Sequence, residues 1–475
     1  MAMPREHLTD FDNPHADDPD LAEAYEAGYR EAAFGTHDAD KPSPFPAGPQ
    51  SDAWKEGFVA GARRFRAYQK GYARGITQGL QHEGTIDPMP NPHPPGDLAN
   101  AWGEGQQDGL LTARVVRDDI ATKALEIAHF DQPAGPIHGS GWYWQEWNGG
   151  RAIYVQRPAD HELPPDAVFA VDAPIHAEYQ RLGGVGGLLG RPVGDTENVP
   201  DGRGTVSEFQ NGTMYATEAT GAREVHGLIR QHWLERGGPR SDLGYPTSNE
   251  LDERADHGKV NTFERGDLYF WPDTGVVEVA GIQVRYRGQN CFGESDEISA
   301  EDETYIVAST VGPTQETIKS TTTSIADVNG GGSYPDFLVL YSGAPAGIGA
   351  LAVTMMEHDA GNPDQYRTQI EGGVRLALNG LAGAIAATGV GLPVSGIALA
   401  LANAGAGPIA NAINSAIGSG DDLIGTDVFP LAPKSLIELA RAELQRERDV
   451  EFNLATKLLS ADGGSYKAYF DVDFV

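Results

Sequence analysis

The stretch that decides the fold of this chain runs from Gly183 to Pro192 and reads GGVGGLLGRP. It returns 54 residues later, from Gly237 to Pro246, as GGPRSDLGYP. The period continues beyond both stretches, because Phe209, Gly212, Tyr215, Gly221, Val225 and Gly227 recur as Phe263, Gly266, Tyr269, Gly275, Val279 and Gly281. A fixed period of this length is typical of one supersecondary unit that stacks on copies of itself.

A partial copy precedes the two full copies. It contains Trp147, Gly150 and Tyr154, followed by Val171, which leads into Ile175 and Tyr179. We therefore expect stacked, β-rich repeats over residues 137–281, made of one half-repeat and two full repeats. Tight glycine turns favour short strands, which we place at residues 212–217 and 266–271.

These residues resemble the LGFP repeats of actinobacterial cell-wall-associated proteins. The family pattern is a helix with an aromatic residue, then GG, LG-aromatic-P, F-x-x-G-x-x-Y and GA-x-x-V-x-G, and residues 174–281 follow it. Arg191 departs from the pattern, because it stands where the family has an aromatic residue. If that aromatic residue contacts ligand, the first full repeat binds more weakly than the second. The resemblance implies non-enzymatic binding to cell-envelope glycan, in a targeting or adhesion adaptor.

Aromatic side chains that do not recur with the period are the candidate glycan-binding residues. Recurring rings are expected in the repeat core, whereas a non-recurring ring is free to stack its apolar face on a sugar while its polar edge stays wet. Either role, core or ligand contact, remains open for each of them. The candidates are Trp142, Trp144, Tyr245, Phe270 and Trp271.

The N-terminal region predicts a small helical module over residues 21–132, after a disordered acidic tail at 1–20. An Ala-aromatic-x-x-Gly unit occurs four times, ending at Gly28, Gly57, Gly71 and Gly105. Glycines cost helix stability, so their regular spacing indicates close helix packing. The order of tyrosine helix, proline-rich loop and tryptophan helix is similar to ribosome modulation factor, in two copies. That resemblance implies the shape of two helical hairpins and no activity, and we expect them to form a small module that packs in this chain or docks a partner.

Residues 282–475 predict an antiparallel β-sandwich. Runs rich in β-forming residues lie at 283–286, 304–309, 337–341, 350–356 and 466–471. The uncharged stretch from Leu376 to Gly420 predicts an apolar helical insertion over 374–418. Residues 435–459 predict one charged amphipathic helix. The fold class is thus a multi-domain α+β protein: a helical module, stacked repeats and a sandwich with a helical insertion.

Acidic residues gather where the predicted strands of the sandwich end. Because calcium takes six to eight oxygen ligands from converging loops, we predict a calcium site formed by Asp302, Asp359, Asp364, Asp421 and Asp422. The loops around Asp359 and Asp421 resemble the calcium loops of the lipid-binding sandwich domains in protein kinase C and synaptotagmin. The alternative is that these are solvated loop carboxylates on a very acidic protein.

Composition limits the remaining classes of function. The formal net charge of −33 opposes nucleic-acid binding, which depends on Lys and Arg. The single cysteine excludes an internal disulfide. We find no HExxH, GxSxG or Walker motif, and so expect no enzyme. The LGFP resemblance implies an extracellular or envelope-associated protein. Met1 to Asp20 lacks the pattern of a secretory signal peptide, so we expect export by another route.

The alternative function is a membrane-active effector or toxin, or the cargo of a larger particle. In that alternative the repeats supply targeting to the envelope and the uncharged residues 376–420 insert into a membrane. A spanning helix needs about 20 mostly apolar residues, and the two proline-bounded halves of this segment are slightly shorter.

Overall fold

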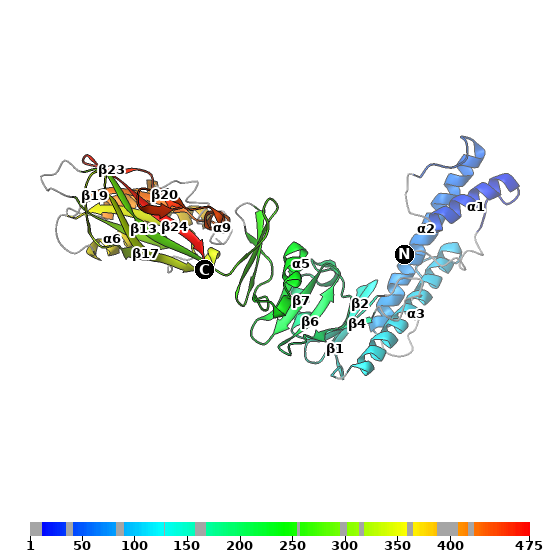
Figure 1. The fold of residues 1–475 in the computed structure, drawn as a ribbon. Coiled ribbons are helices and arrows are strands. Elements are labelled where there is room, and N and C mark those ends of the chain that lie inside the picture. Colours follow the sequence, from blue (N-terminus) through cyan, green and yellow to red (C-terminus); the bar gives the residue numbers. More distant parts are fainter. Residues whose placement is uncertain are drawn as a thin grey trace. The chain divides into compact units, whose positions relative to one another are not determined.

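The computed structural model divides the chain into two compact units, Met1–Glu224 and Val225–Val475, and each is described by itself (Figure 1). Together they form a multi-domain α+β protein, with helices first and antiparallel sheets after them. The structure describes residues 12–34, 41–81, 90–127, 129–156, 168–253, 257–294, 302–312, 318–358, 364–386, 407–416 and 422–475.

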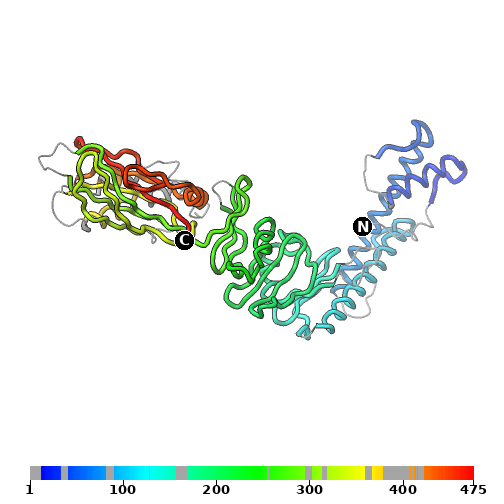
Figure 2. The backbone as a smooth tube through the Cα atoms, in the orientation of Figure 1, coloured from blue at the N-terminus to red at the C-terminus, as the bar shows by residue number. Residues whose placement is uncertain are grey.

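Three helices form the N-terminal module: α1 (Pro19–Phe34), α2 (Pro49–Gln81) and α3 (Asp97–Glu126). The four Ala-aromatic-x-x-Gly units pair two by two along the long helix α2, which Figure 2 traces beside α3. A Cβ added at Gly57 would lie 2.0 Å from the carbonyl oxygen of Tyr25, and one at Gly71 would lie 2.0 Å from that of Trp102. The glycines are therefore contact points between helix backbones. Helix α1 begins inside the predicted tail, two residues before the predicted module.

A four-stranded antiparallel sheet follows, with its strands in sequence order. It comprises β1 (Pro133–Ser140), β2 (Trp142–Trp147), β3 (Arg151–Gln156) and β4 (Val168–Val171). Successive side chains of a strand point to opposite faces, and both faces of this sheet are used. Tyr143, Ile153 and Val155 share a core with Val116 and Ile120 of α3. The opposite face packs on the next repeat, described below.

Two further four-stranded antiparallel sheets confirm the repeat. The first has β5 (Glu197–Asn198), β6 (Gly204–Phe209), β7 (Gly212–Thr217) and β8 (Gly221–His226); the second has β9 (Leu251–Glu253), β10 (Gly258–Phe263), β11 (Gly266–Trp271) and β12 (Gly275–Val279). The short helices α4 (Ile175–Arg181) and α5 (Gly227–Glu235) precede them. Strands β7 and β11 have the predicted bounds, so the 54-residue period reflects a repeated fold.

The C-terminal part is the predicted antiparallel sandwich of two sheets. One has the order β17 (Ser333–Gly343), β13 (Ile282–Gly293), β24 (Gly464–Phe474) and β22 (Leu454–Ala455), with β23 (Leu459–Ala461) beside β24. The other has the order β15 (Lys319–Thr322), β14 (Asp302–Val311), β18 (Ala350–Glu357) and β19 (Asp422–Pro430), with β16 (Ala326–Val328) beside β14. Val284 and Phe470 of the first sheet share a core with Ile306 and Val353 of the second.

The predicted helical insertion is present in part and begins earlier than expected. Helix α6 runs over Asp364–Ala386 and α8 over Gly407–Ala416, whereas residues 387–406 and 417–421 lie outside the described part of the chain. Tyr366, Ile370 and Val374 of α6 are buried against the outer face of β14 and β18. Among the described residues, no helix is both long and apolar enough to cross a membrane.

The single helix predicted over residues 435–459 is wrong. Helix α9 (Pro433–Arg441) ends early, and a hairpin of β20 (Gln445–Glu447) and β21 (Val450–Phe452) follows it. The amphipathic pattern holds only as far as the helix does: Leu436 is fully buried, whereas Leu444 is 47% exposed. Arg448 has a positive φ of 57° in the hairpin turn, a conformation that interrupts a helix.

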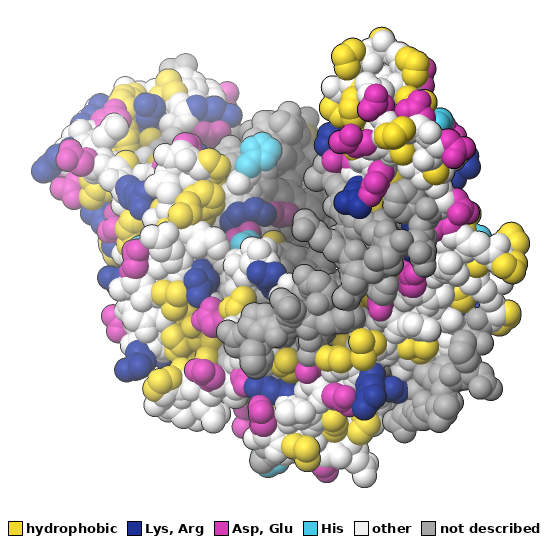
Figure 3. Space-filling view, turned by 90° about the vertical axis from the view of Figure 1, so that its right-hand side faces the viewer, with side chains coloured by type: hydrophobic (Ala, Val, Ile, Leu, Met, Phe, Trp, Pro, Cys, Tyr) yellow, Lys and Arg dark blue, Asp and Glu magenta, His cyan; other side chains and the backbone are white. Residues whose placement is uncertain are grey.

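Charged side chains are not gathered by sign on the face of the molecule drawn in Figure 3. On the face drawn in Figure 3, acidic, basic and hydrophobic side chains are interspersed over the described residues. The net charge of −33 therefore forms no single acidic patch among the described residues of that face.

Candidate functional site

The candidate site lies on the face of the first sheet that points away from the helices. Strand β2 alternates: Tyr143 and Trp147 are buried toward α2 and α3, whereas Trp142 and Trp144 lie at the edge of the core built around α4. Both of these tryptophans are half-buried. The strand thus presents two indole rings, two residues apart, at the border between core and solvent.

Trp144 is the centre of an aromatic stack. The exposed ring of His138 in β1 stacks on it, with centroids 4.6 Å apart and planes at 26°. Tyr154 of β3 lies on it with centroids 6.1 Å apart and planes at 24°. The guanidinium carbon of Arg191 lies over the ring of Trp142, 5.9 Å from the ring centroid. We call Trp142, Trp144 and His138 the aromatic platform.

A hydrogen-bonded chain beneath the platform fixes the ring of Tyr154. Nδ1 of His176 lies 2.9 Å from the Tyr154 hydroxyl, and its Nε2 lies 3.3 Å from a carboxylate oxygen of Glu146. The amide of Gln180 donates to the same hydroxyl at 2.8 Å. Burial lowers the pKa of His176 below its ordinary value, although the Glu146 carboxylate acts in the opposite direction. A network of this kind holds side chains in one arrangement, which favours a preformed binding surface.

The aromatic residue of the LG-aromatic-P motif is a core residue in this chain. Tyr245 has no exposed surface, and its backbone N–H donates to the Glu264 carboxylate at 3.2 Å. Its counterpart Arg191 is exposed and covers Trp142 instead. Tyr245 is therefore removed from the predicted glycan-binding set, and the departure at Arg191 does not take a ligand contact from the first repeat.

Trp271 is corrected in the same way. Its ring is fully buried and stacks on Tyr269, with centroids 5.5 Å apart and planes at 4°. Both rings belong to the core that continues into the sandwich. Phe270 points to the opposite face of the strand and is half-buried. Of the five predicted residues, Trp142, Trp144 and Phe270 thus have surface that a ligand can reach.

The residues of the predicted calcium site are only partly within the described chain. Register places Thr304 opposite Glu357, and Glu357 opposite Asp422, so β14, β18 and β19 bring their acidic ends to one edge of the sheet. Asp302 is buried and accepts a hydrogen bond from the Tyr466 hydroxyl. Asp359, Asp421 and the side chain of Asp364 lie outside the described residues.

Calcium therefore stays a prediction. Within the described part of the chain, no three His, Cys, Asp or Glu side chains come together as metal ligands would. Asp422 is exposed at the start of β19, and Asp302 already has the Tyr466 hydroxyl as a partner.

Sequence reasoning missed the neighbours of the platform. His138, Glu146 and His176 do not recur with the repeat and fit no motif, and Arg191 is visible only as a departure from the LG-aromatic-P pattern. The alternation Trp142-x-Trp144-x-Glu146 was a usable signal, because a period of two places these three residues on one face of a strand. What sequence could not supply is the contact of that face with α4, whose residues lie about 30 positions later.

The comparison with known families agrees with the repeat geometry. The LGFP repeat family model matches residues 189–241 and 243–289, and its two matches start 54 residues apart, at Leu189 and Leu243. The second match runs into β13, eight residues beyond the predicted end of the repeats. It covers neither the N-terminal helices nor most of the sandwich, so the resemblances described for those parts stay expectations. No curated protein matches the chain. The middle of the chain thus contains LGFP repeats, which indicates a cell-wall-associated role at the level of that repeat family.

Proposed function

We propose that this protein is a non-enzymatic adaptor that binds cell-envelope glycan of the actinobacterial type. The observation that carries the proposal is the platform residue Trp144, a half-exposed indole held between the rings of His138 and Tyr154 beside LGFP repeats. A rigid ring loses little conformational freedom on binding. The exposed His138 ring that stacks on Trp144 and the accessible edge of the indole offer aromatic surface to a sugar, and both stay in contact with water.

Phe270 supplies a second contact of the same kind in the second full repeat. It lies on β11 between Lys259 and Val276, which are its register partners on the two neighbouring strands. All three side chains are half-buried. Two separate aromatic contacts on one chain suit a polymer with repeating units, because a linked second contact raises the overall affinity.

The proposal is tested by sedimentation of the full-length protein with isolated actinobacterial cell walls. Trp144→Ala is expected to weaken binding by at least about tenfold, because truncating an anchoring tryptophan costs about 2 kcal/mol or more. Phe270→Ala is expected to weaken binding less, since a half-buried phenyl ring offers a smaller contact surface.

Phe337→Ala is the matched control for Phe270→Ala. Phe337 is 58% exposed on β17 of the sandwich, so removing its ring tests a phenyl group of equal size outside the repeats. Wall binding that is equally strong in the wild type, Trp144→Ala and Phe270→Ala proteins, with unchanged circular dichroism, would remove the platform from the proposal.

A further inference from the structure

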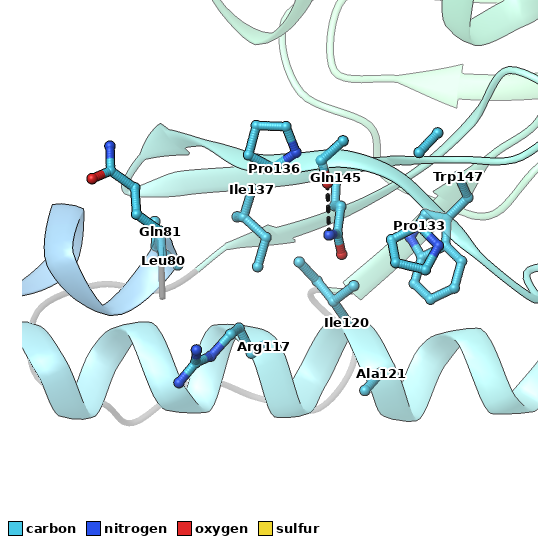
Figure 4. A pocket seen from close by; sticks show the side chains of 12 residues that line it. Leu80, Gln81, Arg117, Ile120, Ala121, Pro133, Pro136, Ile137, Gln145 and Trp147 are labelled. Atoms are coloured by element: carbon cyan, nitrogen blue, oxygen red, sulfur yellow. Dashed lines mark hydrogen bonds between the residues drawn. The ribbon is translucent and has the colours of Figure 1, made fainter. Parts of the chain in front are cut away.

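A pocket of about 620 Å³ lies between the helical module and the first sheet, within the first of the two compact units. Figure 4 shows α3 along one side of it and strands β1 and β2 along the other. The pocket uses the helix-facing side of β2, where Gln145 and Trp147 lie, whereas the aromatic platform uses the opposite side. Its volume is in the range of pockets that hold small organic molecules.

Most of the pocket wall is apolar. Ile137 of β1 and Ile120 of α3 point into the space between sheet and helix from opposite sides, and Leu80 lies at the end formed by α2. Pro133 and Pro136 of β1 also line the pocket, and proline has no N–H to donate. A wall of this kind favours a hydrocarbon chain over a polar ligand.

Trp147 is the polar group that the protein itself leaves unsatisfied in this wall. Its side chain is only 8% exposed, and its ring lies edge-on against Phe130, with centroids 6.0 Å apart. Among the residues that the structure describes, its Nε1–H has no hydrogen-bond acceptor. A buried donor without an acceptor costs free energy, and an oxygen atom on a bound molecule would remove that cost.

Gln145 lies beside Trp147 and supplies the complementary group. Its amide nitrogen donates to the carbonyl oxygen of Gly135 at 2.9 Å, which holds the side chain in place. Its amide oxygen points into the pocket, as Figure 4 shows. The two side chains thus offer one donor and one acceptor, and a hydroxyl group is both an acceptor and a donor.

The pocket offers nothing to neutralise a charged ligand. Its described lining contains no acidic side chain, and its one cationic side chain, Arg117, already has an interaction partner within the chain. In Figure 4 the Arg117 side chain extends along α3 and not toward Gln145 or Trp147. Because burying an unpaired charge costs far more than burying a neutral polar group, an uncharged ligand is favoured.

We propose that this pocket binds an uncharged alkyl alcohol. The alkyl chain lies between Ile120 and Ile137 and runs toward Leu80, and the hydroxyl oxygen accepts from the Trp147 Nε1–H. The hydroxyl hydrogen is then available to the amide oxygen of Gln145. The proposal is independent of glycan binding, because it uses the other face of the sheet.

The test is a nuclear magnetic resonance titration of the full-length protein labelled with ¹⁵N in its tryptophan indoles. The chain has seven tryptophans, and Trp147→Phe assigns the resonance of Trp147. The probes share one alkyl chain and differ in charge: 1-octanol, octanoate and octylammonium. We expect 1-octanol to move the Trp147 Nε1–H resonance downfield to saturation. We expect each charged probe to bind at least about tenfold more weakly.

Three variants, compared by calorimetric titration with 1-octanol, separate the contacts. Ala121→Phe places a ring in the pocket from an exposed position of α3, and we expect affinity to fall by at least about tenfold. Thr122→Phe is the matched control, because Thr122 is exposed on the same helix and outside the pocket lining; it is expected to change nothing. Trp147→Phe keeps a ring but removes the donor, so affinity should fall by about fivefold.

A Trp147 resonance that stays in place at saturating 1-octanol would overturn the proposal. So would octanoate or octylammonium that binds as tightly as the alcohol, or an Ala121→Phe protein with the affinity of the Thr122→Phe protein.

Discussion

The N-terminal helices and the 54-residue repeats both repeat a glycine, and they use it for different physical reasons. Gly71 is helical, and a Cβ there would lie 2.0 Å from the Trp102 carbonyl oxygen. Gly190 and Gly244 of the repeats have φ of 68° and 75°, in the left-handed region. In the helices, the missing side chain of glycine lets two helix backbones approach closely. In the repeats, glycine adopts a left-handed backbone conformation that changes the direction of the chain. The difference teaches that a recurring glycine has to be interpreted with its spacing, which is four residues in one case and 54 in the other.

The largest loss of stability is expected where glycine lets two helix backbones approach closely. Gly71→Ala must push α2 and α3 apart, because the new methyl group meets backbone rather than a flexible side chain, and we expect a loss of about 3 kcal/mol. Hydrogen exchange of the amides in α2 and α3 measures the change locally. Gly103→Ala on α3 is the control: nothing lies within 4 Å of its added Cβ, so it is expected to stabilise the helix by about 0.5–1 kcal/mol. Equal exchange rates in the two variants would contradict close backbone packing.

Among the buried positions at which the two full repeats differ, one makes the second repeat sensitive to pH. Asp267 occupies the place of Thr213, and both side chains are buried. Burial raises the pKa of Asp267 to about 6, although its hydrogen bond with Tyr269 acts in the opposite direction. The folded state therefore prefers the protonated acid. Its contribution to stability is complete below the ordinary pKa of 3.8 and is lost as the pH rises through about 6.

Asp267→Thr copies the first repeat into the second and is expected to remove this pH dependence. At pH 7 the variant should be more stable by about 2 kcal/mol, an order-of-magnitude value from the pKa shift. Urea unfolding between pH 4 and pH 7 measures it, with Asp242→Thr, a change at an exposed site, as the control. A wild-type protein whose stability stays flat over this range would contradict the assignment.

A smaller loss of stability is expected where glycine adopts a left-handed backbone conformation. At Gly190 the nearest atoms to an added Cβ are 3.2 Å away and belong to the side chains of Asn211 and Gln210, which can move. Gly190→Ala should thus cost mainly the left-handed backbone, about 1–2 kcal/mol. Gly190→Asn should cost less, because asparagine tolerates that conformation better. Thermal unfolding compares the two variants, and an asparagine that costs more than alanine would argue against backbone conformation as the cause.

Much of the fold was predictable because the sequence repeats itself. The period placed β7 and β11 correctly, and in the structure equivalent contacts recur with the same period. The Tyr179 hydroxyl donates to the Gly190 carbonyl oxygen at 2.6 Å, and Nε1 of Trp233, 54 residues later, donates to that of Gly244 at 3.2 Å. A repeated unit has to satisfy the same backbone groups in each copy. In the sandwich, alternating β-forming runs were sufficient to locate five strands.

The candidate site was less predictable, because burial depends on what covers a ring. In sequence Tyr245, Phe270 and Trp271 look alike, since none of them recurs. The structure separates them: Trp271 faces a core shared with the sandwich, whereas Phe270 faces the other way. That core contains residues as distant in sequence as Val472, and no local pattern around β11 indicates the contact. The early end of α9 has a similar cause, since charged residues of a short hairpin imitate the polar face of a helix.

The central claim is that attachment to the envelope lies in the repeats and the aromatic platform, and it can be tested directly. The measurement is the binding isotherm of the full-length protein on isolated actinobacterial cell walls, once with calcium and once with a chelator. The account predicts the same affinity in both conditions, because the platform uses rings and hydrogen bonds alone. Binding that disappears with the chelator would contradict it and would place attachment in the acidic loops of the sandwich.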